Sequence, residues 1–203
     1  MGKGRLEAFS DGVLAVAITL LVLDLRVDSN SPLSLGTQLG HEWPSFVAYL
    51  VSFFVIGIIW VNHHAMLAMA ARVDRSLMFY NLLLLMWVVT IPFTTATLAD
   101  FLRDGSADTR LAVLLYGASI EGMAISFVLM LRHLIRHDLL LRAVTGRQAR
   151  MGLMRFGLGA LLYPGFTVVG LFSPVAMLIL YALLDGYYIV DQTPILPDEP
   201  DQA

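Results

Sequence analysis

The chain has 203 residues, of which 58% are hydrophobic and 14% are charged, and its mean hydropathy is +0.74. A soluble domain of this length needs far fewer apolar residues for its core, so the composition indicates a membrane protein. The absence of cysteine excludes disulfides and thiolate metal sites. The net charge of −3 gives no indication of a nucleic-acid partner, and we expect none.

Six apolar windows are long enough to cross a lipid bilayer as helices, since a hydrocarbon core ~30 Å thick requires about 20 mostly apolar residues. They cover residues 6–25, 45–70, 77–98, 111–131, 153–172 and 174–190. We therefore predict an all-α, polytopic membrane protein with six transmembrane helices, in which residues 1–190 form a single domain. Residues 191–203 are acidic and rich in proline, and we expect a short disordered tail there.

The basic residues predict the orientation of the chain, because Lys and Arg in short loops collect on the cytoplasmic side. If both termini are cytoplasmic, ten of the 13 basic residues lie inside and three outside. The inner ones are Lys3, Arg5, Arg72, Arg75, Arg132, Arg136, Arg142, Arg147, Arg150 and Arg155, and the outer ones are Arg26, Arg103 and Arg110. We therefore expect a multi-pass protein of the plasma membrane with cytoplasmic N and C termini. A signal peptide is an alternative interpretation of the first window, although Asp11 interrupts its apolar core.

Charged residues interrupt the start of the first apolar window. Arg5 and Asp11 lie nearly two helical turns apart, so they cannot easily pair along one face of a helix. An unpaired charge at membrane depth is costly, which favours a partner for each on another helix or chain. The alternative is that Arg5 is only an anchor at the membrane surface and Asp11 only a charge near a helix N terminus.

One face of the first window carries small and apolar side chains. At 100° per residue, a single stripe contains Gly12, Ala15, Val16, Thr19, Leu20 and Leu23. Small residues allow close helix packing in lipid, which is one interpretation of the stripe. If copies of this helix instead surround an axis, Val16, Leu20 and Leu23 form successive apolar rings, with the Thr19 hydroxyl between them and Asp24 near the outer mouth. One helix cannot enclose a pore, so this second interpretation requires an oligomer or a further pore-lining helix.

The opening run "RLEAFSDGVLAVAITLLVL" contains an R-x-x-x-F-S-D pattern, whose fixed positions are Arg5, Phe9, Ser10 and Asp11. Further along, "GIIWVNHH" falls in the second window and "TIPFTTATL" in the third. The chain resembles bacterial relatives of the endolysosomal potassium channel called transmembrane protein 175. The resemblance implies a homotetramer in which the first helix of each six-helix subunit lines a central pore that conducts potassium ions passively, without a cofactor.

The resemblance also implies roles for individual residues. Val16, Leu20 and Leu23 are similar to the hydrophobic constriction of the family, and Thr19 is similar to its selectivity threonine. Val16 is smaller than the Ile or Leu often found there. A polar network that holds the pore helix is implied for Arg5, Phe9, Ser10, Asp11, Trp60 and His63 or His64. No "TVGYG" filter occurs in the sequence, so we expect selectivity from side chains, and modest in degree.

Other residues leave alternative functions open. Glu121 and Asp185 lie inside apolar windows, and such carboxylates can serve a proton-coupled secondary transporter. The alternative is that neighbours satisfy them as packing contacts, namely Ser119 and Ser126 for Glu121, and Tyr187 and Tyr188 for Asp185.

A membrane enzyme could use His63, His64 and Asp11, but no recognised catalytic set accompanies them and we expect no enzyme activity. The two histidines point about 100° apart on a helix, so we expect no shared metal.

Overall fold

The chain is described by a computed structural model that covers residues 2–102 and 107–190, without the side chains of residues 155, 156 and 190. It folds into seven α-helices and one 3-10 turn in the described part. They are α1 (Lys3–Leu20), η1 (Leu21–Asp24), α2 (Leu35–His41), α3 (Trp43–Ala68), α4 (Arg75–Phe101), α5 (Ala107–Arg136), α6 (Gly146–Gly170) and α7 (Pro174–Val190). The prediction of an all-helical chain is confirmed. The predicted tail at 191–203 lies outside the described residues.

Five stretches of the described chain are long and apolar enough to cross a membrane: α1 together with η1, α3, α4, α5 and α6. The helix α7 has 17 residues, which at ~1.5 Å per residue gives about 25 Å and lies at the lower limit for a span. The chain is therefore a multi-pass membrane protein, and its sixth span stays a prediction. We did not predict α2 from the sequence. This helix has only seven residues and begins where Ser34 Oγ accepts a hydrogen bond from the Thr37 N–H at 3.2 Å.

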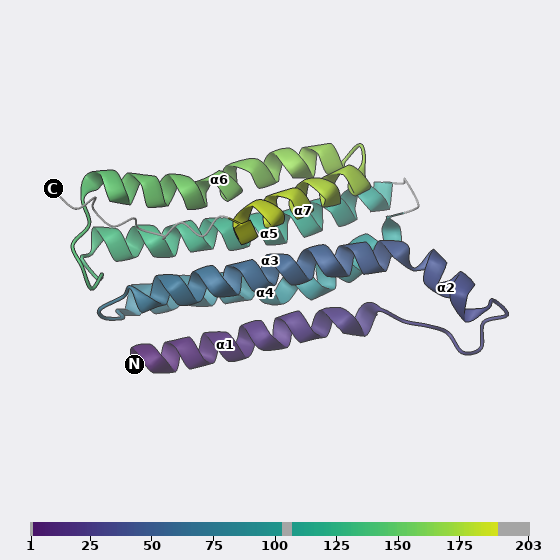
Figure 1. Cartoon of the computed structure of the whole chain (residues 1–203), viewed down its shortest axis with the longest axis horizontal. Coiled ribbons are helices and arrows are strands. Elements are labelled where there is room, and N and C mark those ends of the chain that lie inside the picture. Colours follow the sequence, from purple (N-terminus) through teal and green to yellow (C-terminus); the bar gives the residue numbers. More distant parts are fainter. Residues whose placement is uncertain (1, 103–106, 191–203) are drawn as a thin grey trace.

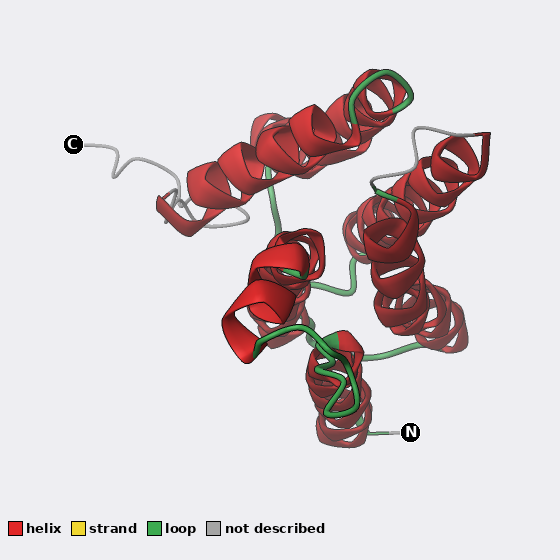
Figure 2. Cartoon of the chain, turned by 90° about the vertical axis from the view of Figure 1, so that its right-hand side faces the viewer, coloured by secondary structure: helices red, strands yellow, loops and turns green. Residues whose placement is uncertain are grey.

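The long helices run roughly along one common direction, with α1 at one edge of the molecule and α6 at the opposite edge (Figure 1). The view along the bundle shows α1 at its rim (Figure 2). The helix α1 packs on α3 and α4, while α5 packs on α4 and α6, and α7 packs on α3 and α6. Within the described residues, α3 and α4 are the long helices that flank α1 closely, so much of the surface of α1 has no partner there.

Hydrogen bonds between buried hydroxyls join the central helices. Ser52 Oγ on α3 lies 2.7 Å from Thr95 Oγ1 on α4 and 3.0 Å from the Tyr116 hydroxyl on α5. A second link joins Thr94 Oγ1 to Ser119 Oγ at 3.0 Å. Lipid tails are as apolar as leucine, so helices in a membrane associate through packing and such polar bonds, each worth about 0.6 to 2 kcal/mol. These hydrogen bonds hold α3, α4 and α5 together as the group of helices against which α1 packs.

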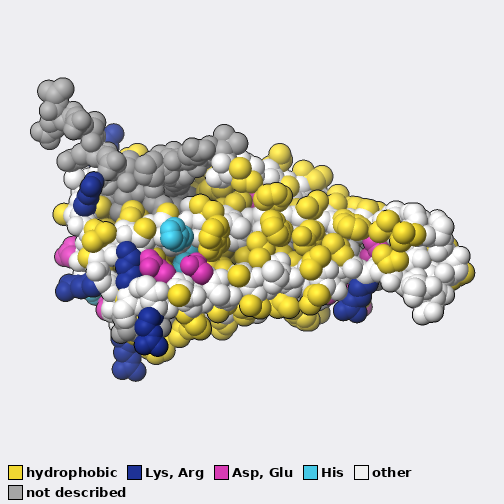
Figure 3. All heavy atoms as spheres, turned by 60° about the horizontal axis from the view of Figure 1, so that its bottom comes forward, with side chains coloured by type: hydrophobic (Ala, Val, Ile, Leu, Met, Phe, Trp, Pro, Cys, Tyr) yellow, Lys and Arg dark blue, Asp and Glu magenta, His cyan; other side chains and the backbone are white. Residues whose placement is uncertain are grey.

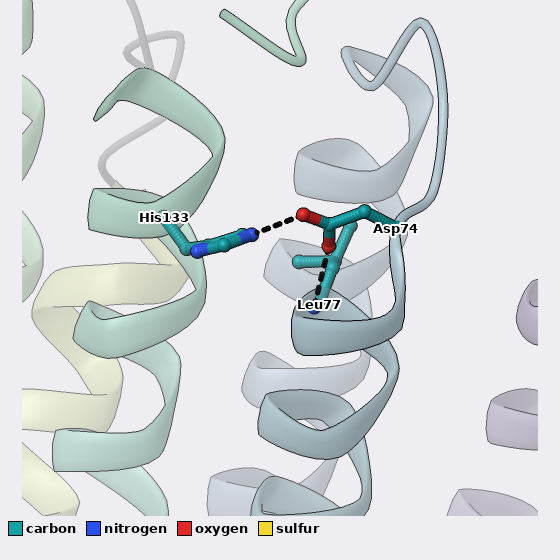
Figure 4. Close-up of polar contacts among 3 residues, drawn as sticks. All are labelled: Asp74, Leu77 and His133. Atoms are coloured by element: carbon teal, nitrogen blue, oxygen red, sulfur yellow. Dashed lines mark hydrogen bonds and ion pairs between the residues drawn. The ribbon is translucent and has the colours of Figure 1, made fainter. Parts of the chain in front are cut away.

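One end of the bundle is tied together by polar contacts. The loops that follow α3 and α5 exchange backbone hydrogen bonds, from Ala71 N–H to the Leu139 carbonyl at 2.8 Å and from Leu141 N–H to the Met69 carbonyl at 2.9 Å. Nearby, Asp74 caps α4 by accepting from the Leu77 N–H at 2.8 Å, and its other oxygen lies 2.8 Å from His133 Nε2 on α5 (Figure 4).

Burial acts to raise the pKa of Asp74, but the bonds from Leu77 and His133 outweigh burial and hold that pKa below its ordinary value.

On the face shown in Figure 3, hydrophobic side chains cover the middle of the molecule, whereas Lys and Arg gather mainly at the end where Figure 1 places the N terminus. That end carries the start of α1 and the connections from α3 to α4 and from α5 to α6, because the long helices alternate in direction. The apolar band agrees with a lipid-embedded protein. The cytoplasmic assignment of the basic end stays a prediction.

Candidate pore-lining face

The face of α1 that carries the predicted stripe is exposed along its whole length. The exposed fractions are 56% for Val16, 41% for Leu20 and 61% for Leu23. The opposite face, which packs on α3 and α4, contains the buried residues Leu6, Ser10, Leu14 and Ala17 of α1 and Leu21 of η1. The helix therefore has one face committed to the subunit core and another open to a second molecule or to lipid.

The Thr19 hydroxyl lies on this open face and bonds within its own helix. It lies 3.0 Å from the Ala15 carbonyl and 2.9 Å from the Val16 carbonyl. Because its proton is directed to these carbonyls, the Thr19 oxygen remains an acceptor for a group beyond the helix. At Gly12, an added Cβ would meet no atom within 4 Å in this subunit, so the surface around Thr19 is also open toward the N terminus.

The helix tightens beyond Leu20, which the sequence did not indicate. The regular α-helix ends there, and Leu21–Asp24 form the 3-10 turn η1. Residues three apart eclipse one another in a 3-10 helix, whereas in an α-helix they lie about 60° apart. The tightening therefore places Leu23 nearly over Leu20 on the same face.

Two polar contacts hold the other side of α1. Asn81 Nδ2 on α4 donates to Ser10 Oγ at 3.0 Å, and Asn81 Oδ1 lies 2.7 Å from His63 Nε2 on α3. All three side chains are at most 1% exposed. Because the amide oxygen can only accept, His63 carries its proton on Nε2 and donates. This chain of contacts joins three helices at one level of the bundle.

The second contact lies one residue further along α1. The Trp60 indole N–H on α3 donates to Asp11 Oδ1 at 2.9 Å. The Asp11 carboxylate therefore has a partner on another helix, as we expected for a charge at membrane depth. Together, the Ser10 and Asp11 contacts restrain both the depth and the rotation of α1 against α3 and α4.

Some predicted network members lie apart from these contacts. Arg5, Phe9 and His64 are exposed, and within the described part of the chain their side chains make no hydrogen bond or ion pair. The structure thus joins His63 rather than His64 to the network, and it joins His63 to Asn81 rather than to the carboxylate. Lys3 adds an unpredicted anchor, since its Nζ donates to the Ala68 carbonyl on α3 at 2.9 Å.

Asn81 is a member of this buried network that the sequence did not reveal. It is a lone amide in the run "FYNLLLLMW", and an amide inside an apolar helix needs a hydrogen-bonding partner. That requirement could have marked Asn81 as part of a network, although it could not have identified Ser10 and His63 as the partners.

Asp24 lies at the end of η1 in a pocket of about 240 Å³. The pocket is lined by Asp24, Arg26, Glu42, Ser45, Ala96, Ala99 and Asp100. Three carboxylates and one guanidinium thus share the end of the molecule that lies opposite the basic end. Arg26 Nε donates to the Leu23 carbonyl at 3.2 Å, which fixes the guanidinium against η1.

Glu121 on α5 and Asp185 on α7 lie away from α1, and each has one buried carboxylate oxygen without a hydrogen-bond partner. The interpretation that Ser119 or Ser126 satisfies Glu121 is wrong, because Ser119 Oγ donates to the Tyr116 carbonyl at 2.7 Å and Ser126 Oγ to the Gly122 carbonyl at 2.6 Å. No group of three His, Asp or Glu in the part of the chain that was searched could hold a metal ion.

Known proteins share this arrangement. A family model described as the endosomal/lysosomal potassium channel TMEM175 matches residues 5–92. A potassium channel of Streptomyces collinus is 45% identical over 195 residues, which cover 95% of this chain and 94% of the relative. The chain belongs to the TMEM175 family. The crystal structure of a lysosomal potassium-selective channel TMEM175 homolog from Chamaesiphon minutus matches with a TM-score of 0.79 and 33% identity, covering 93% of this chain and 96% of that one. The endosomal/lysosomal proton channel TMEM175 of Rattus norvegicus is 34% identical over 114 residues, 51% of this chain and 23% of the relative.

Family membership confirms the resemblance drawn from the R-x-x-x-F-S-D pattern. The named relatives are ion channels, which are not enzymes, and this supports a channel here. The stretch matched by the family model contains α1, α3 and most of α4. It therefore includes the open face of α1 and the residues Ser10, His63 and Asn81 that support it.

Proposed function

We propose that this protein is a potassium-permeable cation channel in which α1 and η1 of four identical subunits surround a central pore. The observation that carries the proposal is the open face of α1, which has small and apolar side chains and no partner in the described part of the subunit. The other face of this helix is fixed by the buried contact of Ser10 with Asn81 and by the more exposed contact of Asp11 with Trp60. Potassium ions, further copies of the chain and the lipid bilayer are its partners, and conduction is passive, without a cofactor.

In an assembly of four helices, the side chains on this face determine the width of the opening. Packed helices lie 8–10 Å apart, so four of them place each helix axis about 6–7 Å from the centre, and side chains extend ~5–6 Å from their own axis. The remaining opening is only about 1–2 Å in radius. Rings of Val16, Leu20 and Leu23 then form a narrow apolar constriction that dewets when closed.

The polar groups near these rings suit a cation. Thr19 presents a hydroxyl oxygen between two apolar levels, where it replaces part of the hydration shell of a passing ion. Asp24, Glu42 and Asp100 raise the local cation concentration at the outer mouth. The chain contains no "TVGYG" sequence, whose backbone carbonyls would form a selective ring, so discrimination between potassium and sodium is modest.

The polar contacts behind α1 serve as support in this mechanism. A rotation of one residue would turn the face by 100° and bring Ser10 and Asp11 out of reach of Asn81 and Trp60. In the proposed orientation, the basic end and both termini are cytoplasmic, and the pocket that contains Asp24 faces the outside.

The test is cation flux from liposomes that contain the purified protein, with potassium, sodium and proton fluxes measured separately. We expect potassium flux to exceed sodium flux, and expect Leu20→Ala and Thr19→Ala to change it. Leu161→Ala is the matched control, because Leu161 is 74% exposed on α6, far from α1. Potassium flux that ignores both α1 substitutions but vanishes in Glu121→Gln would refute the proposed pore and favour the proton-coupled transporter.

A further inference from the structure

A cavity of about 40 Å³ lies among α3, α5, α6 and α7, and Asp185 is part of its wall. Its polar lining residues are Asn62, Tyr163, Asp185 and Tyr188. Asn62 lies two residues from Trp60, about 200° around α3, so the cavity opens on the side of α3 that faces away from the Trp60 contact with α1. The cavity is therefore separate from the candidate pore-lining face.

Asp185 is the charged residue among the described residues that line this cavity, and none of these is a Lys, Arg or His. Its side chain is 5% exposed, and its Oδ2 atom has no hydrogen-bond partner. An ionised carboxylate in this position requires a counter-charge, and a protonated one requires an acceptor for its proton. The described residues supply neither at Oδ2, so the partner of this oxygen lies outside them.

We propose that this cavity binds a single monovalent metal cation, held by Asp185. One carboxylate exactly balances one positive charge, whereas a divalent ion would leave an uncompensated charge in the membrane. Carboxylate, amide and phenol oxygens are hard ligands that suit alkali-metal cations. The Asn62 amide nitrogen donates to the Ile58 carbonyl at 3.0 Å, which leaves the amide oxygen as the ligand atom.

The size of the cavity agrees with this occupant. A water molecule needs roughly 10–15 Å³ measured in the same way, so about 40 Å³ holds one cation with one or two waters. Gly159 sets this size on the α6 side. A Cβ at Gly159 would lie 3.2 Å from a Tyr163 ring carbon and 3.2 Å from the Tyr188 hydroxyl, so a larger residue would displace these two lining side chains and change the shape of the cavity.

The first experiment is crystallography of the full-length protein soaked in thallium(I), whose anomalous scattering marks monovalent-cation sites. We expect a thallium peak in the cavity next to Asp185 in the wild type, and its loss in Asp185→Asn. Sites elsewhere on the protein act as the internal control for soaking. No peak in the wild-type cavity while other sites are occupied, or a peak that persists in Asp185→Asn, would overturn the proposal in favour of bound water.

A second measurement remains decisive if Asp185→Asn folds poorly. The melting temperature of the wild type should rise saturably with potassium chloride beyond the rise in choline chloride at equal ionic strength. Thr19→Ala should retain this difference, and Gly159→Ala should require more potassium to reach it. A wild type that responds equally to both salts, or a Gly159→Ala variant that keeps the wild-type response, would contradict the proposed site. Neither readout uses ion flux, so failure here is distinguishable from failure of the proposed pore.

Discussion

Replacement of Asn81 by leucine tests whether the buried contact behind α1 holds the helix in place. Leucine has a similar volume, so the change removes polar bonds without opening a large cavity. It deletes the 3.0 Å bond to Ser10 and the 2.7 Å bond to His63. Ser10 keeps its 2.9 Å bond to the Leu6 carbonyl, but the His63 Nε2–H is left buried without an acceptor.

The magnitude follows from these two bonds. Interhelical hydrogen bonds in membranes average about 0.6 kcal/mol and reach ~1.7 kcal/mol, and a buried unsatisfied donor costs about 1–3 kcal/mol. We therefore expect Asn81→Leu to lower the unfolding free energy by about 1–3 kcal/mol in a detergent-denaturation or steric-trapping assay.

The control for Asn81→Leu is Thr97→Val, whose lost bond runs within α4 to the Phe93 carbonyl at 2.8 Å. A loss below about 0.5 kcal/mol for Asn81→Leu, or an equal loss for Thr97→Val, would refute the reasoning, because surface-like effects fall in that range. A Ser10→Ala and Asn81→Ala double-mutant cycle should then show a coupling energy above the same ~0.5 kcal/mol.

Three further changes probe other contacts. Trp60→Phe keeps an aromatic ring but removes the N–H that donates to Asp11. It should lower the unfolding free energy by about 1 kcal/mol in the same assay and alter cation flux. Unchanged values of both quantities would contradict a supporting role for this contact. Gly12→Ala should raise the unfolding free energy of the isolated subunit by up to about 1 kcal/mol, because alanine favours the helix and its Cβ meets nothing there, yet change liposome flux if neighbouring subunits face it.

Since the pKa of Asp74 is lowered, its contact with His133 stabilises the fold above the ordinary aspartate pKa near 4 and is lost as pH falls through the lower folded value. Asp74→Asn should therefore cost up to about 1 kcal/mol at neutral pH and flatten the acid side of the stability profile, and a profile identical to that of the wild type would contradict the contact.

The sequence predicted the structure best where the helical spacing of residues determines which side chains are buried. The 100° spacing of the stripe predicted which residues of α1 share a face, and the structure leaves Val16 and Leu20 of that face exposed while it buries Ser10 and Leu14 on the other. Charge distribution also predicted a basic end, which is visible in the arrangement of the helices (Figure 3).

What the sequence could not supply were partners distant along the chain. Asn81 reaches Ser10 across 71 positions, and a single amide has no period that would reveal this. The choice between His63 and His64 required the rotation of α3, which depends on packing against α1 and α4 together. The sequence also did not predict the unpartnered oxygen of Glu121, because the nearby serines donate to carbonyls of their own helix instead.

The 3-10 turn η1 gives the open face a regular spacing that a uniform α-helix would lack. Four α-helical steps from Val16 to Leu20 rise about 6 Å, and three 3-10 steps from Leu20 to Leu23 also rise about 6 Å, whereas three α-helical steps would rise only ~4.5 Å. Leu21 anchors the turn, since it is 1% exposed between α3 and α4. Because Leu21 fixes the turn on its buried side, Val16, Leu20 and Leu23 keep an even spacing on the open side. In a four-fold assembly, symmetry would place each of these side chains at the same height in every subunit, so the even spacing within one helix would give three rings about 6 Å apart.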